Sequence, residues 1–151
     1  MADLTVTISE SVNINGALRG SANTLSITDI EDTFERVVTC INGNVTTIAT
    51  FAAQPYTSAG AIDVDRCKYV RVTNLDTAAW IELAIVTTAS NYTVLLTPGT
   101  SHILAQAEAV ALAEEDTSPS FGTLENLASI QVQPVGASFD PRVEIFAASI
   151  A

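Results

Sequence analysis

The chain has 151 residues, of which 48% are hydrophobic and 15% are charged, a composition too apolar for a disordered chain. Its formal net charge is −11, from six lysine and arginine residues against 17 aspartate and glutamate residues. This acidity argues against unaided binding to nucleic acid or to an anionic membrane. We therefore expect one domain spanning residues 1–151, with protein partners rather than nucleic acid or membrane. The low charged fraction indicates that a partner covers part of its apolar surface.

Short segments with alternating polar and apolar residues follow one another along the chain. The first, LTVTIS at 4–9, has the two-residue period of a half-buried strand. Similar segments rich in Thr, Val and Ile occupy 11–16, 24–28, 34–41, 45–51, 67–73, 80–86, 91–96, 101–104, 128–133 and 142–148. About nine to eleven short strands at this spacing predict an all-β antiparallel sandwich or jelly-roll, as one domain.

Two further segments do not read as strands. The segment AQAEAVALAEE at 105–115 is rich in alanine and glutamate, which favour helix, but it has no convincing cap. It predicts at most a short helix of a turn or two. The next segment, 114–123, is expected to form an exposed acidic loop.

The stretch CKYVRVTNLDTAAWIEL at 67–83 contains the sole lysine and the sole tryptophan. Two alternating runs flank NLDTAA, whose Asn and Asp favour a turn, so we predict a hairpin. Pairing residue 73 with residue 80 would place Arg71 opposite Glu82, and a two-residue shift would place Arg71 opposite Trp80. In either register, Tyr69, Arg71 and Trp80 lie on the same face of the hairpin, the face that points away from the core.

This predicted face has two interpretations. It is either an ordinary amphipathic surface or second core layer, or a protein interface. Tyr, Trp and Arg are the residue types that dominate interface hot spots. The candidate interface residues are therefore Tyr69, Arg71, Trp80 and Glu82.

The sequence contains no catalytic pattern that stands out. The only histidine, His102, lies in TPGTSHIL without a nucleophile motif, and we expect a strand histidine bonded to a neighbour. Glycine-rich phosphate loops are missing from the sequence. We therefore expect a protein that is not an enzyme, with no cofactor.

A bound metal is not expected either, because two separated cysteines and one histidine barely supply a zinc site. Calcium has more support, from Asp63, Asp65 and the acidic residues 114–116. Arg66 and Lys68 lie near enough in the sequence to neutralise the two aspartates, so solvated carboxylates are preferred.

The remaining sequence features concern the cellular compartment and the chain ends. Cys40 and Cys67 are expected to be buried thiols. The first residues lack the basic start and apolar core of a signal peptide, so we expect synthesis in a cytoplasm. Residues 1–9 and 144–151 are both strand-like. Each either adds an edge strand to a neighbouring subunit or closes its own sheet.

Four sequence segments, spread over most of the chain, resemble segments of a known protein family. ITDIEDTFERVV, GAIDVDRCKYVRVTNLDT, LLTPGTSHIL and VEIFAASIA resemble small β-rich virion structural proteins of tailed bacteriophages, of the marine and cyanobacterial type. The resemblance implies a non-enzymatic capsid decoration, or cement, protein on the phage head. It also implies a homo-trimer, with the major capsid protein or another virion protein as partner. It supplies no catalytic residues.

Two alternatives remain open from the sequence. The same sandwich suits a tail or head–tail connector component, such as a tail-tube, adaptor or fibre-associated protein. It also suits a carbohydrate-binding module that uses Trp80, Tyr69 and Tyr92 as stacking platforms, although so few aromatic residues make a long sugar groove sparse.

Overall fold

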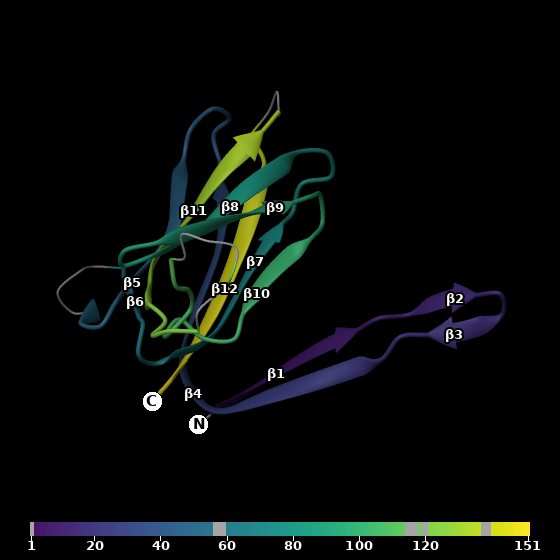
Figure 1. Ribbon diagram of the computed structural model, residues 1–151, viewed down its shortest axis with the longest axis horizontal. Helices are drawn as coiled ribbons and strands as arrows, with labels where there is room; N and C mark the ends of the chain where they lie inside the picture. The colour runs from purple at the N-terminus through teal and green to yellow at the C-terminus, as the bar shows by residue number, and fades with distance from the viewer. Residues whose placement is uncertain (1, 56–59, 114–117, 119–120, 137–139) are drawn as a thin grey trace.

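The computed structural model describes residues 2–55, 60–113, 118, 121–136 and 140–151. Two five-stranded sheets pack face to face in this part of the chain (Figure 1). Sheet 1 contains, in spatial order, β1 (Ala2–Ser9), β4 (Ala22–Thr39), β12 (Arg142–Ile150), β7 (Cys67–Asn74) and β10 (Ser101–Leu104). Sheet 2 contains β6 (Ile62–Asp63), β5 (Thr46–Ala52), β11 (Leu127–Val135), β8 (Trp80–Thr87) and β9 (Asn91–Leu96).

The predicted all-β sandwich is confirmed. Neighbouring strands are antiparallel except β5 and β6, which run parallel. Alternation along each strand sends branched aliphatic side chains into the space between the sheets, which is the arrangement that removes most apolar area from water. The fully buried members of this core include Val70, Val72, Val143 and Ile145 from sheet 1, and Ile48, Ile81, Leu83, Ile85, Ile130 and Val132 from sheet 2.

A β-ribbon projects from the sandwich (Figure 1). We call it the arm and define it as residues 2–28: β1, the first part of β4, and a short hairpin of β2 (Val12–Ile14) and β3 (Ala17–Arg19) at its tip. The hairpin turns at Asn15–Gly16, where both residues have positive φ angles of 52° and 82°. That backbone suits Asn-Gly, the preferred pair for a tight two-residue turn.

The arm and sheet 1 share the 18-residue strand β4. The segments 24–28 and 34–41 were predicted as separate strands, but 24–39 runs within this one strand. At Asp29 the φ angle is +62°, and the pairing with β1 shifts between Ala2 and Leu4. These features mark a β-bulge, which bends a strand without ending it. Residues before the bulge pair with β1, and residues from Ile30 onwards pair with β12.

The predicted short helix at 105–115 is absent from its described part, residues 105–113. The backbone there bonds to flanking strands instead of to itself. The Ala107 N–H donates to the Cys67 carbonyl, and the Ala107 carbonyl accepts from the Leu127 N–H. Helix propensity is a weak prior that such tertiary bonds override. Most of the predicted acidic loop lies outside the described residues. In the described part of the chain, no helix is long and apolar enough to cross a membrane.

Both chain ends contribute strands to their own sheet. The C-terminal strand β12 lies between β4 and β7 and is paired on both sides. It therefore closes its own sheet, which was one of the two expectations for residues 144–151. The N-terminal strand β1 pairs with β4 on one side and lies at the edge of sheet 1.

Asn74 stabilises the crossing, the connection through which the chain passes from β7 in sheet 1 to β8 in sheet 2. Its side chain is fully buried at the end of β7. The Asn74 amide donates to the carbonyls of Ala79 (2.8 Å) and Leu96 (3.1 Å), and its Oδ1 accepts from the Asp76 N–H (3.0 Å). The Asn74 backbone also bonds to Thr100 and Gly99 in the loop between β9 and β10. One side chain thus ties β7 to the start of β8 and the end of β9.

We expect Asn74→Ala to lower the free energy of unfolding by about 3 kcal/mol. The substitution leaves two carbonyls and one N–H without their partner in the interior, and each such group costs about 1–3 kcal/mol. Urea unfolding measures the change. Asn44→Ala, which truncates an exposed asparagine, is the control and should change little. Equal effects of the two substitutions would show that Asn74 does not hold the crossing.

Candidate functional site

The predicted hairpin between 67–73 and 80–86 does not form. Strand β7 lies in sheet 1 and β8 lies in sheet 2, so neither predicted register exists. Asn74 and Asp76 do close a turn, as expected, but this turn passes between sheets. The candidate interface residues therefore divide between two outer faces. Tyr69 and Arg71 lie on sheet 1, whereas Trp80 and Glu82 lie on sheet 2.

The outer face of sheet 2 is a mixed apolar and polar surface around Trp80, whose side chain is 49% exposed. Strand alternation and cross-strand pairing determine which residues share this face. We call it the tryptophan face and define it as Trp80, Glu82, Ala84, Thr93, Leu95, Gln131, Gln133 and Val135. Trp80 pairs with Val135, and Glu82 lies between Gln133 and Leu95. Exposed large apolar side chains beside amides and a carboxylate are typical of a protein-binding surface.

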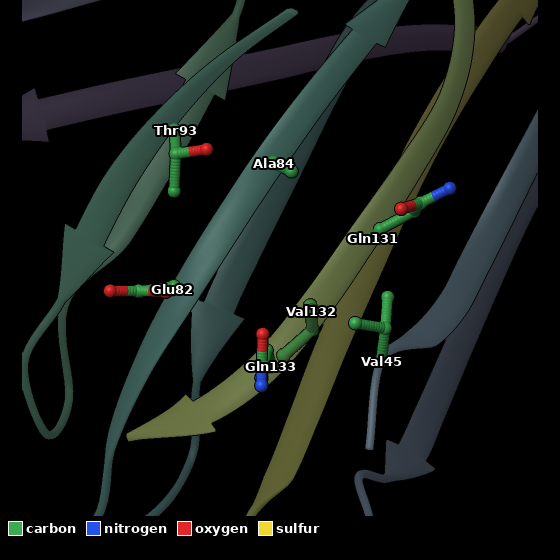
Figure 2. Close-up of a pocket in the computed structure, with 7 residues that line it drawn as sticks. All are labelled: Val45, Glu82, Ala84, Thr93, Gln131, Val132 and Gln133. Carbon is green, nitrogen blue, oxygen red and sulfur yellow. The ribbon is translucent and has the colours of Figure 1, made fainter. Parts of the chain in front are cut away.

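A small hollow of about 110 Å³ opens on the tryptophan face. Figure 2 shows the short side chain of Ala84, on β8, between Thr93 of β9 and Gln131 of β11. Glu82 lies further along β8, and Gln133 lies further along β11. Because alanine is much smaller than its neighbours, it leaves a depression. The hollow is far smaller than the 300–1,000 Å³ of a usual small-molecule pocket, so it suits a protruding side chain of a protein partner.

The outer face of sheet 1 is partly covered by the base of the arm. Tyr69 is only 4% exposed and packs with Ile30 and Ala148 in a small second core. Its ring meets Phe146 edge to face, with centroids 6.1 Å apart. Burial raises the pKa of the Tyr69 hydroxyl. Tyr69 is therefore a packing residue within one subunit rather than an exposed contact.

Arg71 lies beside this second core and is held by its neighbours. Its guanidinium donates to the Glu144 carboxylate and to the Thr73 hydroxyl. Glu144, rather than the predicted Glu82 or Trp80, is thus the partner of Arg71. Sequence periodicity could not show this pairing, because β12 reaches β7 from the far end of the chain.

An open groove of about 350 Å³ lies between the arm and the outer face of sheet 1. We call it the arm groove. Its apolar lining comes from Leu4, Val6 and Ile8 of β1 and from Tyr69, Ile103 and Phe146 of sheet 1. The sequence analysis missed this groove because the alternation of 4–9 is the same for a strand over a core and for a strand in a projecting ribbon.

His102 behaves as expected for a histidine satisfied by a neighbour. Its Nε2 lies 3.2 Å from the Tyr92 hydroxyl, and the two rings meet edge to face. The pair joins edge strands β10 and β9 of opposite sheets. Burial lowers the pKa of His102 and raises the pKa of Tyr92. Tyr92 is therefore half-buried and bonded rather than presented as a stacking platform.

Of the two aspartates considered for calcium, Asp63 pairs with Arg66, whereas Lys68 pairs with Glu108 instead of with Asp65. Asp63 Oδ1 accepts from the Asp65 N–H (3.0 Å), and Asp63 Oδ2 lies 3.6 Å from Arg66 Nε. Lys68 Nζ lies 3.2 Å from the Glu108 carboxylate and donates to the Asp65 carbonyl. Residues 114–116 lie outside the described part. Among the described residues, no three or more potential ligands gather in a way that could hold a metal.

Both cysteines are buried, as expected. Burial raises the pKa of the Cys40 thiol to about 11 and also raises the pKa of the Cys67 thiol. Because the thiolate is the reactive form, neither group is suited to nucleophilic chemistry near neutral pH.

Glu125 organises the turn between β8 and β9, a role the sequence analysis did not identify. Its carboxylate accepts hydrogen bonds from the hydroxyls of Thr87 and Ser90 and from the Ala89 N–H. These bonds, chiefly those from Thr87 and Ser90, hold the pKa of Glu125 below its ordinary value of 4.5. The cluster fixes one end of the strands that carry the tryptophan face.

Comparison with known proteins does not assign the chain to a family. No protein-family profile matches it, and no curated protein matches it. One solved structure that matches the chain comes from work entitled "Bacillus endospore appendages form a novel family of disulfide-linked pili". It aligns with 82% of this chain and 90% of its own, at 8% identity and a TM-score of 0.46.

We expect Glu125→Gln to lower the melting temperature at neutral pH and to have a smaller effect in acid. A carboxyl whose pKa is lowered by folding stabilises the folded state above its unfolded pKa, and this contribution is lost as the pH falls through the folded pKa. The difference in melting temperature between Glu125→Gln and the unmodified protein should therefore have its full size above pH 4.5 and become smaller below it. Glu82→Gln, on the same sheet but exposed, should change melting little at any pH. A difference for Glu125→Gln that is constant with pH would contradict this role.

Proposed function

We propose that this chain is a non-enzymatic virion structural protein of a tailed bacteriophage, and specifically a decoration protein that binds the head lattice. The observation that carries the proposal is the placement of two surfaces with exposed apolar side chains on opposite sides of one sandwich. The tryptophan face lies on sheet 2, and the arm with its groove lies on sheet 1. A subunit that contacts both a lattice and a neighbouring subunit requires two such surfaces.

Stabilisation of the head would follow from mass action. A protein that binds the mature lattice but not its disrupted form shifts the equilibrium towards the intact shell. The tryptophan face suits the lattice contact, because tryptophan is one of the residue types that dominate interface hot spots and Trp80 is exposed on the face that carries the hollow. The chain's acidity favours a basic partner surface, which an acidic subunit approaches faster.

A tail or head–tail connector role is the second candidate. It would use the same two surfaces, and the projecting arm in particular suits a subunit that reaches over its neighbour. The location on the particle distinguishes the two roles.

A carbohydrate-binding module has less support. Of its three proposed platforms, Tyr69 is covered by the arm and Tyr92 is bonded to His102. Trp80 alone remains exposed on a sheet face. Specific micromolar binding on a glycan array would nevertheless favour this module over both virion roles.

The proposal is tested by immunogold labelling of purified virions with antibody against the recombinant protein. We expect gold over the whole head. Gold confined to the tail or to one vertex would support the connector role instead. Intact particles without gold would contradict any virion role.

We expect Trp80→Ala to weaken binding to undecorated heads by roughly 30-fold, the effect of a hot spot worth about 2 kcal/mol. Because Trp80 is half exposed, its truncation should leave the melting temperature nearly unchanged. Sedimentation of protein with heads measures the binding. Val37→Ala, at a similarly exposed apolar residue on β4 of sheet 1, is the control and should bind normally. Unchanged binding of Trp80→Ala would exclude the tryptophan face as the lattice contact.

A further inference from the structure

Among the residues that the structure describes, the arm packs against the sandwich near its base. There Leu4, Val6 and Ile27 are half-buried against the second core around Tyr69 and Ile30. Towards the tip, the apolar side chains are exposed: Ile8, Leu25, Val12, Ile14 and Leu18, the last of them 74% exposed. A two-stranded ribbon is at best marginally stable in water without a further partner for its apolar side chains. The outer part of the arm therefore lacks a partner within its own subunit.

Leu4, Val6, Ile8, Leu25 and Ile27 form one face of the arm, because Leu4 pairs with Ile27 and Val6 pairs with Leu25. The opposite face of this part of the ribbon is mostly threonine and serine. Such alternation is expected where one face of a ribbon is covered. The apolar face continues beyond the base, where the subunit itself no longer covers it.

The arm groove offers a surface of the same character. Leu4, Val6 and Ile8 line one wall, and Ile103 and Phe146 line the other. Ile103 is itself partly exposed at the edge strand β10. The groove is open rather than closed by the subunit's own residues, so an apolar ribbon from outside could remove both walls from water at once.

Charge distribution favours a second copy of this chain as the occupant. Copies with a net charge of −11 repel one another. The arm, however, carries only Asp3, Glu10 and Arg19 among its 27 residues, so it adds little to this repulsion. Arg19 lies near the tip, and Glu35, on the outer face of sheet 1 beside Phe146, is exposed. The charged residue that lines the groove is Arg71, whose charge is balanced by Glu144, so Arg19 of an incoming arm can pair with Glu35 beside the groove.

We propose that the tip of the arm of one copy, residues 12–19, inserts into the arm groove of a second copy. This inference deepens the proposed function, on which it rests, by naming the contact that joins the subunits before or during lattice binding. The arm of one copy and the groove of the next form a heterologous contact, and in the expected trimer this contact closes as a ring of three. The chain supplies both halves of the interface, so the contact needs no other protein.

Light scattering of the purified protein is the first test. We expect the unmodified chain to have three times the 15.8 kDa mass of one copy. The double variant Ile14→Ser/Leu18→Ser should fall to the mass of one copy, because it removes the two most exposed of the three large apolar side chains at the tip. Its far-ultraviolet circular dichroism should stay unchanged, because the tip does not belong to either core, whereas its melting temperature should fall with the loss of the subunit contact. The matched control Val45→Ser/Leu95→Ser truncates two exposed apolar residues away from the arm and should keep the oligomer.

Disulfide cross-linking tests the contact itself. A chain with Ile14→Cys is mixed with a differently tagged chain with Ile103→Cys and oxidised. We expect a covalent heterodimer, whereas the control pair Ile14→Cys and Leu95→Cys should give at least ten-fold less. The native thiols of Cys40 and Cys67 do not compete because both are fully buried.

The outcomes separate this inference from the proposed function. A monomer at every concentration, an oligomer that survives Ile14→Ser/Leu18→Ser, or equal cross-linking of both cysteine pairs would overturn the arm contact. None of these results depends on virions. Conversely, an arm-dependent oligomer that is absent from purified particles would retain the arm contact and contradict the virion role.

Discussion

The structure depends on the hydrogen bonds of Asn74. This side chain satisfies two carbonyls and one N–H at the place where the chain leaves sheet 1 and enters sheet 2. Because a buried polar backbone group without a partner is costly, an apolar residue here would make the crossing unfavourable. The same asparagine bonds through its backbone to the loop between β9 and β10. The two sheets are therefore joined by polar bonds at this end, by the Tyr92–His102 bond between β9 and β10, and in the core by the packing of aliphatic side chains.

This crossing explains the distribution of surfaces. Once β7 and β8 lie in different sheets, their outer faces point in opposite directions, and the side chains of Arg71 and Trp80 cannot share one patch. Trp80 remains exposed on sheet 2, whereas Tyr69 is covered by the base of the arm on sheet 1. The result is a subunit with exposed apolar side chains on each side. The proposed role, in which one side binds a lattice and the other a neighbouring copy, requires such an arrangement.

The arm shows how a regular strand pattern can be used in two ways. In β12 the alternating residues face the main core, and in β1 they face the second core at the base and solvent towards the tip. Hydrophobic burial stabilises the first arrangement within one subunit. The second leaves apolar area that only a partner can cover, which is why the arm, although strand-like in sequence, is the candidate for assembly. The bulge at Asp29 allows one long strand to serve both parts.

The sequence by itself determined most of the local strands and the all-β class, because strand alternation acts between residues close in the chain, but it did not predict β3 or β6 and divided β4 in two. It also correctly predicted buried cysteines and a histidine bonded to a neighbour. Tertiary structure alone decided that 67–73 and 80–86 separate, that Arg71 pairs with Glu144, and that 105–113 bonds to flanking strands instead of forming a helix. Each of these outcomes rests on partners distant in sequence. Alternation indicates which side of a strand is apolar. It does not indicate which other strand, or which other molecule, will cover that side.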